Sequence, residues 1–386
     1  MEPQGALRPG TVAYDWTRVL TPDDGALLRR LPLARLARMP PPKRRGLPLG
    51  HELRILARFL SGRSSSLDPS GLAPLYERWL SPSERALLRA LVLRDAVSAE
   101  DWKRMLGDAF RDWCERGHLV EQGEGLRCRF AVVPLDDRIF VVDPQEGAYG
   151  GKVHIGQDSL NLLEFARRRV PPPDGRVLDV GTGSGVLLIA LGRRAASAVG
   201  VDINPRAVRA ARLNAAINEL VQATIEECDV FEQAKSLGRF DLVVWNAPFM
   251  FFPEHERETN LDGDGGHLGI ELTLRFVEHL PLLLRDTGRA LLLTAAPILE
   301  TGENRLVEEL RPRAERLQLD VAGRVLQPFW VPRLASFYQS HGIDRFESTV
   351  LDLRLGTGRL RLAGPGSGQR MARIARGFMY RIRHKS

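Results

Sequence analysis

Short runs of apolar residues alternate with longer amphipathic segments through the second half of the chain. The runs lie at 176–180, 198–202, 223–229, 241–246 and 289–295. This alternation predicts a parallel sheet with helices on both of its faces. Two later apolar runs, 318–325 and 348–355, are expected to close the sheet as an antiparallel edge pair.

The first part of the chain has helical rather than alternating patterns. Two helical patterns, 24–37 and 51–61, flank a proline-rich loop at 39–46. A helix is then expected to open at Ser81, where a capping serine precedes Pro82 and an apolar run.

A second helix is expected near Ser98 and a third over 108–116, ending at Gly117. Strand-like runs at 126–133 and 138–142 follow, separated by 134–137. Three helices and a hairpin indicate a winged-helix-like module. Such a module binds nucleic acid or serves as a packing domain, and we favour packing because a fold does not imply a function.

These patterns divide the chain into four predicted regions. They are an N-terminal helical or irregular extension (1–75), the winged-helix-like module (76–145), the α/β domain (146–365) and a basic tail (366–386). The tail carries six cations and no acid between Arg370 and Lys385, with apolar residues at helical spacing. A basic amphipathic helix there either contacts RNA or packs against the protein.

Composition narrows the function classes. The net charge of +7 favours polyanionic partners such as RNA or ribosomes. An arginine-rich composition can, however, give the same positive charge in a protein that has no such partner. No apolar run is long enough for a bilayer, and the start of the chain has no apolar core of a secretory signal. Three widely spaced cysteines argue against disulfides and fit a cytoplasmic protein.

A glycine-rich turn is the strongest chemical signal. Residues 177–185 read Val-Leu-Asp-Val-Gly-Thr-Gly-Ser-Gly, so a strand ends near Asp179, turns on three glycines and enters an apolar helix. Glycines permit torsions that other residues avoid and let a ligand approach the backbone. The third glycine of a dinucleotide fingerprint is replaced by Val186, and the lysine of a phosphate-binding P-loop is absent.

Acids follow the next two predicted strands. Asp202 ends 199–202, where a carboxylate can accept the two ribose hydroxyls of a nucleoside. Asp229 ends the following strand and can accept the adenine amino group, with Val230 or Phe231 against the ring. Each acid alone would suit a helix cap, but together with the glycine turn they predict a nucleoside site.

The fourth strand ends in Asn246-Ala247-Pro248-Phe249. An amide or exocyclic amino nitrogen is a poor nucleophile because its lone pair is delocalised. The Asn246 side-chain oxygen and the Ala247 carbonyl can accept its two N–H groups, Pro248 stiffens the turn, and Phe249 offers a face for a planar group. The pattern therefore favours an enzyme that transfers a chemical group to a planar nitrogen.

These motifs resemble those of class I methyltransferases of the "methyltransferase small" group. That group includes glutamine methyltransferases of release factors and ribosomal proteins and guanine-N2 methyltransferases of rRNA. Its Asn-Pro-Pro-Phe/Tyr motif has Ala247 here in place of the first proline, which keeps the carbonyl but loses rigidity. Residues 156–159 resemble the group's Pro-x-Asp-Thr segment, and 264–269 resemble its Gly-Gly-x-x-Gly segment.

The resemblance implies a Rossmann-like α/β domain with a seven-stranded sheet and S-adenosylmethionine (SAM) as cofactor. The implied cofactor residues are Asp158, Ser159, Asp179, Gly181, Thr182, Gly183, Gly185, Asp202, Ile203, Asp229, Val230 and Asn246. The implied catalytic residues are Asn246, Ala247, Pro248 and Phe249. No metal is expected, because the histidines share no ligand spacing.

The expected reaction is N-methylation of a macromolecule, either a glutamine amide in a translation protein or a base amine in RNA. One alternative is a small-molecule methyltransferase of secondary metabolism, whose front domain would serve as a lid or as a dimerisation element. Another is a nucleic-acid-binding protein with a degenerate cofactor domain, against which the intact Asp179, Gly183, Asp202 and Asn246 argue.

Overall fold

The computed structural model describes residues 14–33, 80–144, 151–169 and 171–363. Three predictions lie outside these residues: the proline-rich loop at 39–46, the helix at 51–61 and the helix in the basic tail. The helix predicted over 24–37 ends at Arg30, because Leu31 has an extended backbone. The chain divides into two compact units, one containing 14–33 and 80–144 and the other containing 151–169 and 171–363. Each unit is described by itself.

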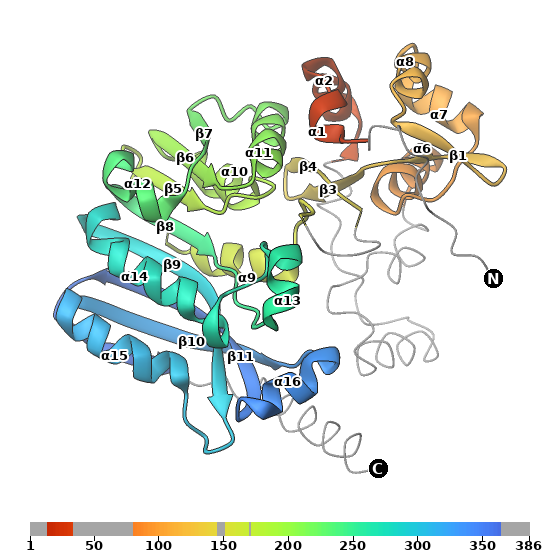
Figure 1. Cartoon of the computed structure of the whole chain (residues 1–386). Coiled ribbons are helices and arrows are strands. Elements are labelled where there is room, and N and C mark those ends of the chain that lie inside the picture. The colour runs from red at the N-terminus through yellow and green to blue at the C-terminus, as the bar shows by residue number, and fades with distance from the viewer. Residues whose placement is uncertain (1–13, 34–79, 145–150, 170, 364–386) are drawn as a thin grey trace, which may run out of the picture. The chain divides into compact units, whose positions relative to one another are not determined.

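The first unit is built from short helices and two small hairpins (Figure 1). Its elements are α1 (Trp16–Val19), α2 (Pro22–Arg30), α6 (Pro82–Leu87), the π-helix η1 (Leu88–Val92), α7 (Ala99–Leu106), α8 (Ala109–Glu115), β1 (Leu119–Gln122), β2 (Gly125–Cys128), β3 (Ala131–Leu135) and β4 (Arg138–Val142). The predicted serine cap is confirmed, because Ser81 accepts from the Glu84 N–H. The helix expected near Ser98 begins there too, and Ser98 caps it by accepting from the Asp101 N–H.

The predicted single strand at 126–133 is wrong. The chain forms two separate strands there, β2 and β3, and β2 pairs with β1, which the sequence pattern did not indicate. After its first residue β1 is exposed, so it lacks the apolar alternation by which a half-buried strand is recognised. The β3–β4 hairpin is tighter than expected, because Pro134 and Leu135 belong to β3 and only Asp136 and Asp137 form the turn.

Buried polar contacts join α2 to the helices that follow residue 80. The Asp24 carboxylate accepts two hydrogen bonds from the Arg116 guanidinium, both of 2.7 Å, and one of 2.7 Å from the Trp113 indole N–H. The Trp16 indole N–H likewise donates to Asp143 at 2.7 Å. These contacts place α1 and α2 in the same unit as 80–144, while the winged-helix-like character of the module stays a prediction.

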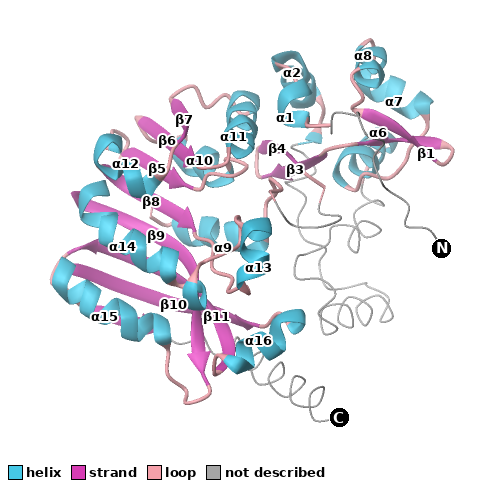
Figure 2. Cartoon of the chain, in the orientation of Figure 1, coloured by secondary structure: helices cyan, strands magenta, loops and turns pink. Residues whose placement is uncertain are grey.

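The second unit is a helix-covered sheet (Figure 2). Its strands are β5 (Arg176–Val180), β6 (Ser197–Asp202), β7 (Ala223–Glu227), β8 (Phe240–Asn246), β9 (Leu284–Leu299), β10 (Leu319–Phe329), β11 (Ile343–Leu355) and β12 (Leu360–Ala363). Its helices are α9 (Gln157–Ala166), α10 (Val186–Gly192), α11 (Pro205–Ile217), α12 (Val230–Leu237), α13 (Glu254–Arg257), α14 (Glu271–Leu283), α15 (Arg305–Leu317) and α16 (Ala335–Ser340). Three 3₁₀ turns complete it: η2 (Glu258–Asn260), η3 (His267–Gly269) and η4 (Pro332–Leu334).

The sheet has the order β12-β10-β11-β9-β8-β5-β6-β7. Strands β5 to β9 are parallel, as predicted, and β11 runs antiparallel to both β9 and β10. The expected seven strands become eight among the described residues, because β12 adds to β10 in parallel and forms the edge in its place. Strand β12 is only four residues long, alternates half-buried and exposed residues, and was not predicted from the sequence.

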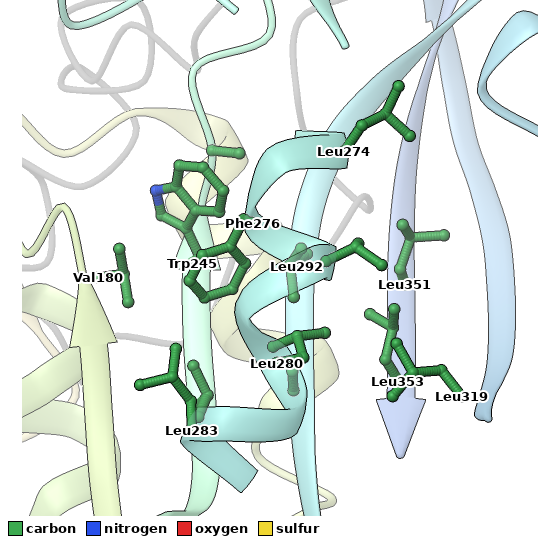
Figure 3. Close-up of a cluster of buried hydrophobic side chains, with 14 of the residues drawn as sticks. Val180, Trp245, Leu274, Phe276, Leu280, Leu283, Leu292, Leu319, Leu351 and Leu353 are labelled. Atoms are coloured by element: carbon green, nitrogen blue, oxygen red, sulfur yellow. The ribbon is translucent and has the colours of Figure 1, made fainter. Parts of the chain in front are cut away.

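Helices cover both faces of this sheet. Helices α9, α10 and α11 pack side by side, and α12, α14 and α15 form a second packed group. The core under the second group includes Trp245 and Phe276, whose ring centroids lie 4.5 Å apart, with Leu280 and Leu292 beside them (Figure 3). Burial on both faces explains the apolar run 242–245 of the central strand β8, whereas the edge strand β7 buries only Ile225.

The structure also gives information on two predictions made from composition, those on membrane-spanning segments and on the cysteines. Within the described ranges, no helix is long and apolar enough to span a membrane. Cys114, Cys128 and Cys228 are free thiols.

Candidate functional site

Four loops meet at one edge of the sheet, because β5, β6, β7 and β8 are parallel and their carboxyl ends coincide. Strand β5 lies between β6 and β8, because the chain runs from β5 through β6 to β7 and then crosses back to the other side of β5 to form β8. Sheets of this kind bind ligands at such a switch point, outside the carboxyl ends of the strands. The predicted site residues of all four strands lie at this edge.

The glycine turn after β5 has the conformation that its sequence predicts. Gly181, Gly183 and Gly185 have φ values of +58°, +54° and +78°, which residues with a side chain rarely adopt. A Cβ built on Gly183 would meet nothing nearer than the Gly181 carbonyl oxygen at 3.8 Å, so this glycine borders open space. On Gly181 the added Cβ would lie 3.3 Å from the Trp245 indole nitrogen, which limits substitution there.

Asp179 and Thr182 hold the turn from within. The buried Asp179 carboxylate accepts from the Thr182 hydroxyl at 2.8 Å and from the Leu188 N–H at 3.0 Å. Burial raises the pKa of Asp179 to about 7, against the opposing effect of these two hydrogen bonds. Both side chains thus shape the loop, and direct contact of either with the cofactor stays a prediction.

Sequence reasoning missed a further support of the turn. The buried Asn214 side chain, from α11, donates to the Ser184 carbonyl at 2.9 Å. An asparagine among the alanines of an otherwise apolar helix face is the signal that could have identified it.

Asp202 links the tip of β6 to the glycine turn. Its two carboxylate oxygens accept from the Gly183 N–H and the Asn204 N–H, each at 2.9 Å. Burial raises the pKa of Asp202 against these backbone hydrogen bonds. Beside it the Ile203 side chain is 63% exposed, which leaves an apolar surface where the sequence predicts a nucleoside.

The Asp229 segment agrees only partly with the predicted adenine contact. Asp229 caps α12 through a 2.8 Å hydrogen bond from the Phe231 N–H. Val230 is buried in the core, and the Phe231 ring packs against Trp245 and His279. A role for this segment beside adenine stays a prediction.

Asn246 ends β8 and meets α9 across 87 residues of sequence. Its side-chain N–H donates to the Ser159 hydroxyl oxygen at 3.1 Å. Its Oδ1 atom is buried and has no donor among the described residues. The Ala247 N–H donates to the Leu293 carbonyl at 3.0 Å, which fixes the backbone that follows.

The segment after Asn246 packs tightly against the glycines at 265–269. A Cβ on Gly269 would lie 2.4 Å from the Phe249 carbonyl oxygen, and one on Gly265 would lie 2.8 Å from the Phe249 Cα atom. The Met250 N–H donates to the Gly263 carbonyl at 2.8 Å. The Phe249 ring is half-buried and meets Phe329 edge-on, with 5.6 Å between ring centroids. The sequence match at 264–269 therefore corresponds to a close backbone contact.

Asp158 lies beside Ser159 in the first turn of α9. Burial raises its pKa, while the nearby His154 has the opposite effect. Among the residues that the structure describes, no group of three or more histidine, cysteine or acidic residues could hold a metal.

These features suit a nucleoside cofactor. The loop has one glycine, Gly183, that borders open space, an acid bridges the first two strand ends, and an exposed isoleucine lies beside that acid. The residues present therefore fit SAM, with Asp202 at its ribose and Ile203 among its other contacts as the predicted arrangement.

Comparison with known proteins decides the family. The family model described as a methyltransferase domain matches residues 172–275. A Methanocaldococcus jannaschii protein, provisionally named a protein N5-glutamine methyltransferase, is 33% identical over 177 residues, covering 45% of this chain and 84% of that protein. This chain is a class I SAM-dependent methyltransferase.

Two further relatives of this methyltransferase carry substrate names. A release factor glutamine methyltransferase of Rhodospirillum rubrum is 29% identical over 242 residues, covering 60% of this chain and 65% of the relative. A ribosomal protein L11 methyltransferase of Lactobacillus gasseri is 31% identical over 160 residues, covering 39% of this chain and 45% of the relative. The methyltransferase thus spans less than two thirds of either relative.

Proposed function

We propose that this methyltransferase methylates a planar amide nitrogen, the side chain of a glutamine in a protein of the translation apparatus. The observation that supports this most directly is the buried Asn246 Oδ1 atom, which has no donor among the described residues. A buried acceptor without a donor costs about 1–3 kcal/mol. An acceptor substrate that brings an N–H group to this atom removes that cost.

The chemistry follows from the two oxygens at the end of β8. SAM supplies a methyl group on a positively charged sulfur. The Asn246 side-chain oxygen and the Ala247 carbonyl accept the two N–H groups of the substrate amide and turn its lone pair toward that methyl. These hydrogen bonds strengthen as the nitrogen becomes pyramidal, so they stabilise the transition state more than the bound substrate. The half-buried Phe249 ring offers a face for the amide plane.

The choice of glutamine rests on the relatives. Two of them are named for glutamine methylation, one provisionally, and one of these acts on release factor by its name. The exocyclic amine of an RNA base presents the same pair of N–H groups, and the net charge of +7 favours it. It is therefore the second candidate, and the two differ in the chemistry of the product.

Methyl-tritiated SAM and an extract of cells that lack this enzyme provide the test. We expect label in the protein fraction. Strong acid hydrolysis should then release it as volatile methylamine, because the N-methyl amide bond is cleaved. Label that stays on a base in the RNA fraction would support the second candidate, and label in small molecules would contradict both.

The Asn246→Ala variant tests the role of the side-chain oxygen. We expect SAM binding to stay largely intact and the transfer rate to fall on the order of a hundredfold, the usual cost of one preorganised contact to the transition state. Pro248→Ala is the matched control, since it removes stiffness but neither acceptor, and its loss should be much smaller. A wild-type rate for Asn246→Ala would overturn transfer to nitrogen while leaving SAM binding unaffected.

A further inference from the structure

We propose that Ser159 is a positioning residue that fixes the Asn246 amide with its oxygen facing the substrate nitrogen. This inference rests on the proposed function in one respect, namely that a planar nitrogen lies at Asn246. It gives Ser159 a role distinct from the cofactor contact that the sequence suggested.

The contact joins two segments that are fixed independently of each other. Ser159 lies in the first turn of α9, and this helix buries Leu162, Leu163 and Ala166 and contacts β8 and β9. Asn246 is the last residue of β8, between paired strands. The 3.1 Å hydrogen bond from Asn246 Nδ2 to Ser159 Oγ therefore links two rigid elements.

The bond matters because an asparagine amide has two unlike ends. A half-turn about the Cβ–Cγ bond exchanges the carbonyl oxygen and the NH₂ group, which have almost the same shape. If the NH₂ group faced the substrate, two donors would meet and the lone pair would not be oriented. Within the described residues, the Nδ2 group has the Ser159 oxygen as its acceptor, and the Oδ1 atom at the other end has no donor. The hydrogen bond to Ser159 thus stabilises the orientation that leaves an acceptor for the substrate.

The expected effect of removing the hydroxyl is modest and measurable. Loss of one neutral hydrogen bond corresponds to a roughly 2- to 10-fold change in an equilibrium. Ser159→Ala should lower the transfer rate by that factor and leave the SAM dissociation constant unchanged. Ser159→Thr keeps a hydroxyl at the same helix position and should restore most of the rate. Ser236→Ala, which removes a hydroxyl from exposed α12 surface, is the matched control and should leave the rate unchanged.

A double-mutant cycle separates positioning from a general structural effect. In the Asn246→Ala background there is no amide left to orient, so adding Ser159→Ala should cause no further loss of rate. Calorimetry gives SAM affinity, and initial rates of tritium transfer into the macromolecules of the extract give turnover. Multiplying losses in the double variant would overturn the inference. So would a Ser159→Ala defect seen entirely as weaker SAM binding, which would support the cofactor contact.

A spectroscopic measurement makes the test independent of the acceptor. The Asn246 side-chain NH₂ signals can be assigned in a ¹H–¹⁵N spectrum by their absence in Asn246→Ala. They should shift in Ser159→Ala and stay near their wild-type positions in Ser159→Thr. Unchanged signals in Ser159→Ala would overturn the inference even if no substrate were methylated. If label appears on an RNA base, the glutamine proposal fails while the rate comparison still tests Ser159.

Discussion

Replacing Asp202 with alanine should weaken SAM binding by a factor that can be worked out from its contacts. The carboxylate lies at the carboxyl end of β6, where ribose hydroxyls are expected. Loss of a hydrogen bond to a charged acceptor costs about 1.5–3 kcal/mol. Since each 1.4 kcal/mol is tenfold in affinity, the dissociation constant should rise roughly 10- to 150-fold.

The same substitution also removes two hydrogen bonds within the protein. The Gly183 and Asn204 N–H groups lose their acceptor, which lowers stability and loosens the glycine turn. Asp320→Ala controls for this effect, because Asp320 also accepts from two backbone N–H groups, those of Thr357 and Arg359. Asp320 lies on β10, separated from β6 by β11, β9, β8 and β5.

Calorimetric titration with SAM at constant pH is the appropriate assay for both variants. The Asp320 variant should bind like the wild type and the Asp202 variant should not. Thermal unfolding of each variant checks that both remain folded at the titration temperature. An affinity loss below about threefold in a folded Asp202 variant would refute the ribose role, and equal losses in the two variants would attribute the effect to stability alone.

Three further predictions concern stability and the loop after β8. Burial raises the pKa of Asp179 from 3.8 to about 7, so between these pH values the folded protein keeps a proton that the unfolded chain loses. The free energy of unfolding should therefore fall as pH rises from about 4 to 7, by up to roughly 4 kcal/mol. Asp179→Asn should flatten this dependence, and parallel urea midpoints for both proteins between pH 4 and 8 would count against it. Gly269→Ala places a Cβ 2.4 Å from the Phe249 carbonyl oxygen at a φ of +72°, so it should displace the loop after β8. The rate of methyl transfer should fall on the order of a hundredfold while the affinity for SAM, measured by calorimetry, stays unchanged. Burial raises the pKa of Asp24, but the hydrogen bonds from Arg116, Thr21 and Trp113 together outweigh it and lower the value to about 2. The ionised carboxylate therefore stabilises the protein at neutral pH, and this stabilisation is lost as pH falls from about 4 to 2. Arg116→Met leaves the Asp24 carboxylate buried without its cation and should cost about 3–5 kcal/mol; an unchanged melting temperature at pH 7 would contradict this.

Features that depend on neighbouring residues could be predicted from the sequence. Strand β5 contains the apolar residues Val177, Leu178 and Val180, and the three glycines after it adopt left-handed torsions, which residues with a side chain rarely adopt. Ser81 and Ser98 cap helices because a side-chain oxygen reaches an N–H three residues away. Such contacts form within one turn of chain, so local sequence contains the information.

The local sequence patterns could not predict every strand pairing. Strands β1 and β12 are only four residues long, and they form because a partner strand supplies hydrogen bonds to their backbone. The sequence likewise indicated that β10 and β11 pair, but the addition of β12 beyond them depends on the exposed edge of β10.

The sequence by itself determined which residues gather at the site, because the carboxyl ends of parallel strands share one edge of a sheet. Only the tertiary structure decided how their side chains are oriented. The hydrogen bond between Ser159 and Asn246 spans 87 residues, and the one between Asn214 and Ser184 spans 30. Contacts of this kind depend on how α9 and α11 pack against the sheet. That packing is set by the whole core and not by the residues adjacent to each side chain.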